Sequence, residues 1–141
     1  MRPFPPIVVS MLLLPACFSP PEGSARVEID LPEQALRVGG GPVASALIHG
    51  DQDVSVSLLR LSGPVAMHRH RKSEEIVYLL SGEGFLDLSS GRRELRAGDF
   101  LVVPRNTPHA FTPTGAEPAV VLQLFVPHFV EGDRIFEEPA K

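Results

Sequence analysis

The sequence predicts a single domain built from β-strands. Its 141 residues are enough for one hydrophobic core, and 43% of them are hydrophobic. Fifteen prolines and twelve glycines separate short apolar runs, a pattern typical of an all-β domain with many turns. No helical period of useful length appears between these runs. We therefore expect one all-β domain without internal repeats.

Alternating or continuous apolar residues mark the expected strands. Residues 26–30 alternate like an edge strand, whereas residues 100–103 and 119–126 are so continuously apolar that we expect both of their faces to be covered. Glycine-containing segments at 82–84 and 89–92 predict two successive hairpins. The remaining expected strands are residues 45–49, 53–61, 68–70, 75–80, 85–88 and 93–96.

Charge and aromatic content argue against a nucleic-acid partner. The formal net charge is −4, and acidic and basic residues are interspersed, so no basic surface is expected. Tryptophan is absent and the eight phenylalanines are scattered, which disfavours a platform for stacking bases. No glycine-rich phosphate loop precedes a helix. The expected partner is a small molecule.

The first two dozen residues differ in kind from the rest. Arg2 precedes an apolar stretch, residues 7–14, that is too short to span a bilayer as a stable helix and has the size of a signal-peptide core. Leu14, Ala16 and Cys17 are spaced as in a bacterial lipobox, which this segment resembles.

These features divide the chain into three parts. We expect a lipoprotein-type signal peptide over 1–16, a linker over 17–25 that begins with the lipidated residue Cys17, and the β domain over 26–141. Acyl chains on Cys17 would hold the protein on a membrane surface of the bacterial cell envelope, facing the periplasm or the exterior. The alternatives are an ordinary cleaved signal, or an uncleaved tail on a cytoplasmic domain.

Two histidines and a following glutamate are the most informative residues. On a strand, His68 and His70 share a face at a Cα separation of about 7 Å, while Arg69 points away. A hairpin at 71–73 would turn the carboxylate of Glu75 back toward them. A histidine pair at this spacing also occurs by chance on an exposed strand, so the pair alone leaves both interpretations open.

A third histidine lies 39 residues beyond the pair. His109 follows a turn bracketed by Pro104 and Pro108, which would deliver it at the start of a strand. Neutral imidazoles with one carboxylate suit divalent Fe, Mn, Ni, Cu or Zn better than Ca or Mg. If these residues share a metal site, its cofactor is one divalent transition metal.

The residues from 63 to 82 resemble the first motif of the cupin superfamily. That motif consists of a glycine, a His-x-His pair, a glutamate and a second glycine, here Gly63, His68, His70, Glu75 and Gly82. Four residues separate the first glycine from the first histidine, where the family usually has five.

The second cupin motif is matched by a later segment. Gly98, Pro104 and His109 stand in the expected places. Asn106 replaces the usual turn glycine, which is tolerable because asparagine also adopts the left-handed conformation. Pro113 stands where the family often has asparagine, so no role is carried over to it.

The resemblance implies a small antiparallel β-barrel, or jelly roll, formed by a single cupin unit. It also implies a metal held from one side, with positions open to water, substrate or dioxygen. The family allows the glutamate one position earlier, but strand alternation turns Glu74 toward solvent. The ligands implied are His68, His70, Glu75 and His109.

The resemblance also implies a homodimer, because family members commonly pair strands and pack sheets. The N-terminal strand and the tail over 127–136 are candidates for that contact. The same apolar residues would serve equally well to cap the barrel of their own chain.

Three residues are candidates for the pocket beside the metal. Phe111 shares the parity of His109 and should point inward, whereas Tyr78 should pack outside. Gln123 lies in an apolar strand and should have a partner. It would either bind substrate or water, or hydrogen-bond to the barrel backbone or to a metal ligand. Arg60 would either pair with an anionic substrate or remain solvated.

Two classes of function fit these residues. The first is a metal-dependent enzyme, such as a dioxygenase, an isomerase or a lyase, acting on a small oxygenated molecule. The second is a non-catalytic module that binds a metal or small ligand at the cell envelope. No serine or cysteine nucleophile has an evident base, so any chemistry should be that of the metal. The complete four-ligand set favours the enzyme.

Overall fold

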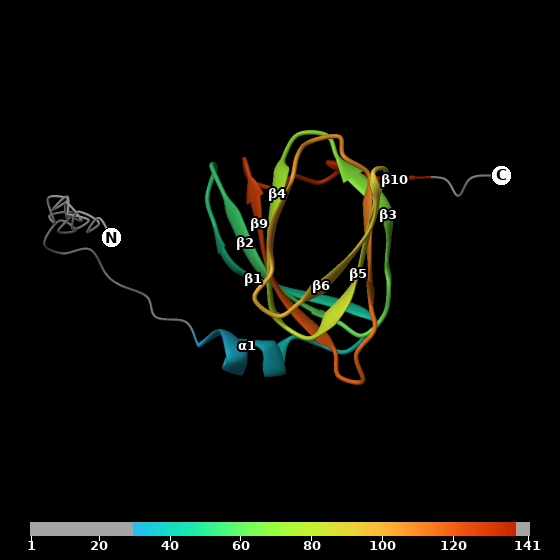
Figure 1. The fold of residues 1–141 in the computed structure, drawn as a ribbon. Helices are drawn as coiled ribbons and strands as arrows, with labels where there is room; N and C mark the ends of the chain where they lie inside the picture. The colour runs from blue at the N-terminus through green and yellow to red at the C-terminus, as the bar shows by residue number, and fades with distance from the viewer. Residues whose placement is uncertain (1–29, 138–141) are drawn as a thin grey trace, which may run out of the picture.

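The structure, a computed structural model, describes residues 30–137 as one helix followed by ten strands (Figure 1). The expected signal peptide (1–16), Cys17, the linker (17–25) and residues 26–29 of the first expected strand lie outside the described residues. The elements are α1 (Leu31–Arg37), β1 (Val43–Gly50), β2 (Ser55–Leu61), β3 (Val65–His70), β4 (Glu74–Ser81), β5 (Glu83–Leu88), β6 (Gly91–Arg96), β7 (Phe100–Val103), β8 (His109–Pro113), β9 (Ala119–Val126) and β10 (Arg134–Phe136).

The strands form two five-stranded sheets that face each other as the walls of a barrel (Figure 1). Sheet A has the order β1-β2-β9-β4-β7, and sheet B has the order β10-β3-β8-β5-β6. All pairings between neighbours are antiparallel. The expected all-β fold, a small antiparallel barrel of jelly-roll type in a single domain, is confirmed.

Two of the expected hairpins are corners between the sheets. The turn at 71–73 leads from β3 in sheet B to β4 in sheet A, and the turn at 82–84 leads from β4 back to β5 in sheet B. Of these three turns, only the one at 89–92 closes a hairpin, between β5 and β6. Hairpins and corners use the same turn residues, so sequence does not separate them. At one corner, Gly82 has φ +85°, and a Cβ there would lie 2.8 Å from Ala119 Cα.

Helix α1 was not expected from the sequence. Its seven residues make about two turns, too few for a helical period to emerge. Asp30 caps it by accepting a hydrogen bond from the backbone N–H of Glu33 at 2.9 Å. Ala35 of the helix and Val38 just after it pack with Leu58 on the outer face of sheet A. Among residues 30–137, no helix has the length and apolar character that a membrane crossing needs.

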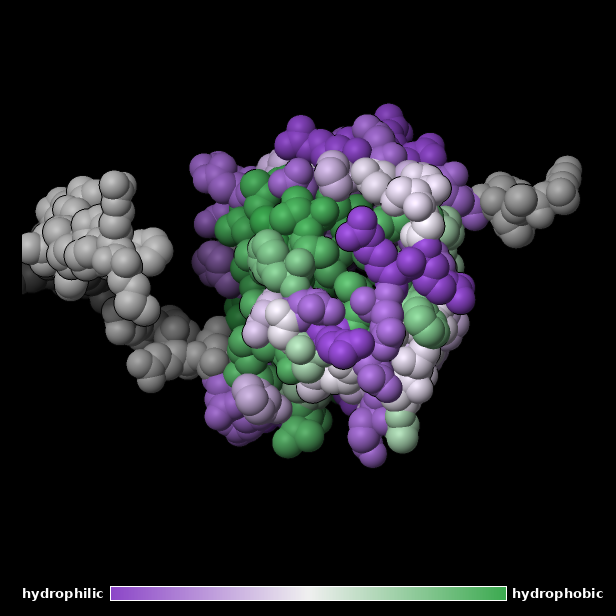
Figure 2. All heavy atoms as spheres, viewed as in Figure 1, coloured by the Kyte–Doolittle hydropathy of each residue, from purple (hydrophilic) through white to green (hydrophobic). Residues whose placement is uncertain are grey.

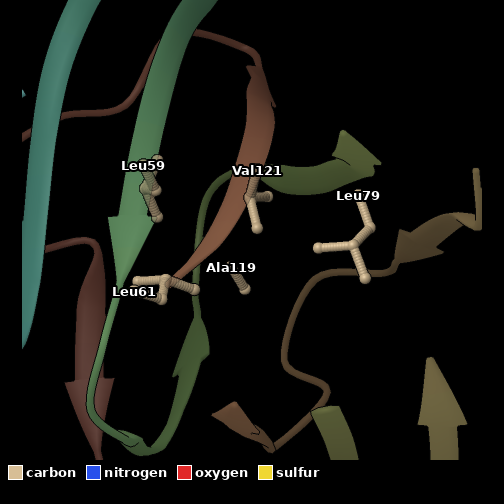
Figure 3. Close-up of a cluster of buried hydrophobic side chains, with 5 residues drawn as sticks. All are labelled: Leu59, Leu61, Leu79, Ala119 and Val121. Atoms are coloured by element: carbon tan, nitrogen blue, oxygen red, sulfur yellow. The ribbon is translucent and has the colours of Figure 1, made fainter. Parts of the chain in front are cut away.

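A cluster of aliphatic side chains fills one end of the barrel interior (Figure 3). It consists of alternate residues on three adjacent strands of sheet A, which therefore point to the same face. Burying one such leucine contributes about 1.5–3 kcal/mol to the free energy of folding. The same inward row of β9 continues as Gln123 and Phe125, which belong to the other, more polar end. The cluster is Leu59, Leu61, Leu79, Ala119 and Val121.

Strand β7 is covered on one face only. Phe100 is 63% exposed and Val102 46% exposed, contrary to the expectation that both faces of this strand are covered. The reason is its place at the edge of sheet A, where no second layer lies over the outward side chains. Hydrophobic residues accordingly gather on the side of the molecule where sheet A lies (Figure 2). An apolar run in the sequence does not reveal whether another part of the molecule covers the outer face of the strand.

The C-terminal tail caps the barrel of its own chain. Strand β10 pairs antiparallel with β3, so that Arg134 lies opposite His70 and Phe136 opposite His68. A hydrogen bond of 2.9 Å from the backbone N–H of Glu137 to the carbonyl of Met67 extends the pairing. The tail thus becomes the edge of sheet B and brings its side chains to the histidines.

Candidate metal centre

The three motif histidines come from neighbouring strands of sheet B. His68 and His70 lie on β3, and each is 2% exposed. His109 begins β8 and pairs directly with His68. Paired residues on adjacent strands direct their side chains to the same face, so all three imidazoles enter the barrel from one wall.

Glu75 reaches the histidines from the opposite wall. It lies on β4 in sheet A and is 5% exposed, whereas Glu74 is half-buried and has the opposite parity. The choice of Glu75 over Glu74 agrees with this burial. The four residues meet across the interior, and one ligand atom from each lies within 4.8 Å of all the others. This buried cluster of His68, His70, Glu75 and His109 fits a metal site.

Backbone carbonyls orient two of the imidazoles. His68 Nδ1 lies 2.7 Å from the carbonyl oxygen of Ala66, and His109 Nδ1 lies 2.9 Å from that of Thr107. A carbonyl oxygen only accepts hydrogen bonds, so Nδ1 carries the hydrogen in both rings. In His68 the lone pair of Nε2 is thereby left for a metal, the usual arrangement in which the second ring nitrogen fixes the tautomer.

A carboxylate orients the third imidazole. His70 Nδ1 lies 3.2 Å from Oδ2 of Asp133, whose side chain is completely buried and also accepts from the Ser73 hydroxyl and the Lys72 backbone N–H. Burial raises the pKa of the Asp133 carboxyl, but these hydrogen bonds and the nearby His70 outweigh it and hold the pKa below its usual range. Sequence analysis missed Asp133, because its partners are about sixty residues away in the chain.

Two buried nitrogens in the cluster have no hydrogen-bond partner, namely Nε2 of His68 and Nε2 of His70. The latter lies 3.3 Å from Glu75 Oε2 but outside hydrogen-bond geometry. Buried polar atoms without partners are rare, because their lost hydration is not replaced. A metal ion between these nitrogens and the carboxylate would satisfy them.

The carboxylate of Glu75 is ionised and held by two other side chains. Gln123 donates its amide N–H to Oε1, and His109 Nε2 lies 2.8 Å from Oε2. Burial raises the pKa of Glu75, but the hydrogen bond with His109 and the nearby His70 ring outweigh it and place the pKa well below its usual range. Of the two roles left open for Gln123, the structure shows the hydrogen bond to a candidate ligand.

Burial and the charge of Glu75 also shift the pKa values of the histidines. Burial lowers the pKa of His68 to about 4, so this ring is neutral at neutral pH. Burial also lowers the pKa of His109, but its hydrogen bond to Glu75 and the charge of that carboxylate prevail and raise it. Without a metal, a proton between His109 and Glu75 supplies the positive charge that a cation would bring.

A cavity of about 110 Å³ adjoins the cluster, and residues from all ten strands line it. A single water needs about 10–15 Å³, so the space admits a small molecule. Phe111 and Gln123 line the cavity as expected. Tyr78 is 38% exposed and lies outside it, also as expected. Two thirds of the lining residues are apolar, and the polar ones are Ser45, His68, Glu75, His109, Gln123 and Arg134.

Arg60 does not reach the cavity. Its neighbours on β2, Leu59 and Leu61, both line the cavity, and strand alternation places Arg60 on the other face of sheet A. The arginine that does line the cavity is Arg134, which the sequence did not single out. No local sequence pattern identifies Arg134 as a cavity residue, because its position depends on the pairing of β10 with β3.

Fold and site together define a class: a single-unit antiparallel β-barrel whose interior holds a buried cluster of three histidines and one glutamate. Residues 61–126 match the family described as the cupin domain. This match spans both motifs that resemble the cupin pattern. The fold of this chain is that of a cupin, and the family match supports its place in the cupin superfamily.

Solved structures share this fold at low sequence identity. An uncharacterized conserved protein with a double-stranded β-helix domain from Klebsiella pneumoniae has a TM-score of 0.68 at 19% identity, over 82% of this chain and 99% of the other. The nucleoside dehydratase Pac13 of Streptomyces has a TM-score of 0.60 at 21% identity, over 69% and 79%. The oxalate decarboxylase of Lactobacillus farciminis has a TM-score of 0.60 at 23% identity, over 70% and 32%.

Two curated proteins are similar in sequence. An uncharacterized protein of Methanocaldococcus jannaschii is 27% identical over 99 residues, which cover 66% of this chain and 79% of that protein. Protein SchB of Streptomyces halstedii is 34% identical over 72 residues, which cover 50% of this chain and 52% of SchB. These similarities are consistent with the fold and carry no activity over to this chain.

Proposed function

We propose that this protein binds one divalent transition metal through His68, His70, Glu75 and His109 and is an enzyme that acts on a small oxygenated molecule. The observation that carries the proposal is the pair of buried, unpartnered Nε2 atoms of the two β3 histidines beside an ionised carboxylate. A metal of this kind supplies Lewis acidity, or activation of water or dioxygen.

The chain's own residues would bind and enclose the substrate. Of the cavity-lining residues that the structure describes, the titratable ones are three candidate ligands, His68, Glu75 and His109, together with Arg134. The lining therefore offers no separate side chain to serve as a general base, a group that acid–base catalysis would place within hydrogen-bond reach of the substrate. This favours reactions in which the metal does the chemistry, as in a dioxygenase, an isomerase or a lyase.

The similar structures support this proposal at the level of fold. One is a nucleoside dehydratase and another an oxalate decarboxylase, so the same barrel carries enzymes in other proteins. One fold hosts many chemistries, so their substrates are not transferred to this chain. The choice among reaction types rests on assays of this protein.

Metal analysis tests the proposal directly. We expect protein that begins after residue 17 to hold about one transition metal per chain, and the His68→Ala, His109→Ala double variant to lose nearly all of it. The matched control is His49→Ala, which removes an exposed histidine on β1. Full retention of metal in the double variant would show that the cluster is not the metal site.

The alternative is a non-catalytic module that binds a metal or small ligand. The observation in its favour is the mainly apolar lining, which offers few polar groups to direct a reaction. Oxygen uptake and product analysis with iron-loaded protein and a panel of diols, diketones and phenols distinguish the two. An enzyme consumes at least one of these compounds, whereas a binding module retains it unchanged.

A further inference from the structure

Arg134 faces the interior of the barrel beside the histidine cluster. It lies directly opposite His70 in the β10–β3 pairing, and opposed residues of an antiparallel pair direct their side chains to the same face. Because His70 points inward, Arg134 does too, and it lines the same cavity as His68 and Glu75. It is the only lysine or arginine among the described residues that line this cavity.

The charge of Arg134 is not neutralised within the described part of the chain. Its Nε atom is buried without a hydrogen-bond partner, and no carboxylate of residues 30–137 lies within ion-pair distance of it. Its guanidinium instead lies over the ring of Phe129, 5.7 Å from the centroid. By contrast, Arg69 on the adjacent strand pairs with Glu137, and Arg92 pairs with Asp87.

A half-buried guanidinium that has no counter-charge among residues 30–137 is prepared for an anionic ligand. Partial burial weakens its hydration, and only an acceptor that enters the cavity restores the lost hydrogen bonds. Stacking on Phe129 fixes the planar group, so little side-chain entropy is lost when a ligand binds. A carboxylate matches the two parallel N–H bonds that a guanidinium offers.

The other residues that line the cavity indicate the body and the net charge of that anionic ligand. Its one acidic lining residue, Glu75, already accepts from Gln123 and contacts His109, so it does not compete for Arg134. Two thirds of the lining is apolar, which favours a ligand with a hydrocarbon body. A single arginine balances one negative charge, whereas a phosphate dianion would require further donors.

We propose that Arg134 recognises the carboxylate of a small monoanionic substrate whose apolar body fills the cavity. The inference rests on the proposed function, since it names the class of molecule that the same site takes. Arg134 holds the carboxylate at the end of the barrel where the metal ligands lie, and so positions the rest of the molecule between them and the aliphatic core.

Binding of matched charged and neutral probes tests this assignment. Butanoate and benzoate, each compared with its amide, are titrated by calorimetry into metal-free and metal-loaded protein. In the wild type we expect each carboxylate to bind more tightly than its amide. In Arg134→Met we expect carboxylate affinity to fall roughly tenfold to a hundredfold, the usual effect of losing hydrogen bonds to a charged group, while amide affinity stays the same.

Two further variants control for the charge of residue 134 and for the loss of an arginine elsewhere. Arg134→Lys retains the charge without the planar fork and should bind carboxylates with intermediate affinity, so it reports on charge even if Arg134→Met folds poorly. Arg60→Met removes an arginine outside the cavity and should leave both affinities unchanged. A wild type that does not prefer carboxylates, or an equal loss in Arg60→Met, would overturn the assignment.

Metal content, measured on the same samples, separates this inference from the proposed function. If Arg134→Met keeps its metal and its carboxylate affinity, the inference is wrong and the metal site stands. If the wild type binds no metal yet prefers carboxylates through Arg134, the metal proposal is wrong and the anion site stands.

Discussion

Each imidazole of the candidate metal centre is held by a hydrogen-bond acceptor at its Nδ1 atom, and the three acceptors differ in origin. His68 and His109 use carbonyls two residues earlier in their own strands or turns. His70 uses the carboxylate of Asp133, 63 residues later. Since a carboxylate partner raises the basicity of a metal-bound imidazole, His70 should be the strongest metal ligand of the three histidines.

This arrangement predicts a defined effect of removing Asp133. In Asp133→Ala, His70 loses its orienting partner, and metal affinity should fall about 10- to 100-fold, as is usual for groups that orient metal ligands. Competition with a chromogenic chelator measures the affinity. Asp133→Asn, which keeps an acceptor oxygen without the charge, should recover part of it.

The control for that experiment is Asp87→Ala. Asp87 lies on β5 and forms a surface ion pair with Arg92, 2.7 Å between Oδ1 and Nε, and such pairs contribute little to stability. Metal affinity should remain at the wild-type value. If Asp133→Ala also left it unchanged, Asp133 would be a structural residue of the β10 corner and not an orienting partner of His70.

At the scale of elements, strand β7 leaves an unusual surface. Phe100 and Val102 lie opposite Tyr78 and Ile76 on the outward face of sheet A, and three of these four are exposed. Exposed apolar side chains along an edge strand favour pairing with another molecule. We propose this face as the contact of the homodimer that the cupin resemblance implies.

Light scattering measures the oligomeric state. We expect a dimer for the wild type and a monomer for Phe100→Lys, because a charged side chain at the centre of an apolar contact is costly to bury. Leu47→Lys serves as the control, since Leu47 is 66% exposed but lies on β1, at the opposite edge of sheet A. A dimer that persists in Phe100→Lys would place the contact elsewhere.

At the scale of the whole molecule, Cys17 precedes the first described residue, Asp30, by thirteen positions. We propose that lipid on Cys17 holds the barrel at a membrane surface of the cell envelope, on the basis of its lipobox-like context. The barrel, with its candidate metal centre, would then act outside the cytoplasm.

Metabolic labelling with radioactive palmitate in a bacterial host tests the anchor. The wild type should incorporate label and sediment with membranes, whereas Cys17→Ala should do neither, because Cys17 is the only cysteine in the chain. Equal labelling of the two proteins would end the hypothesis. Intact folding of both, checked by circular dichroism, ensures that the comparison concerns the anchor alone.

The sequence by itself determined most of the described strands and the four candidate ligands. Turn residues and apolar alternation are local properties, and the spacing of the two histidines on one strand fixes their common face. Glu75 and His109 were identified because they stand at set distances along the chain within recognisable motifs. The inward direction of Phe111 and the need of Gln123 for a partner followed from the same alternation.

Only the tertiary structure decided which wall of the barrel each strand joins and what the C-terminal tail does. The turns at 71–73 and 82–84 proved to be corners between sheets, so Glu75 faces the histidines from the opposite sheet and not from a hairpin. Arg60 does not reach the site, because it lies on the outer face of sheet A. Asp133 and Arg134 reach it because β10 pairs with a strand more than sixty residues earlier. Such pairing depends on the packing of the whole chain, which no local pattern of residues encodes.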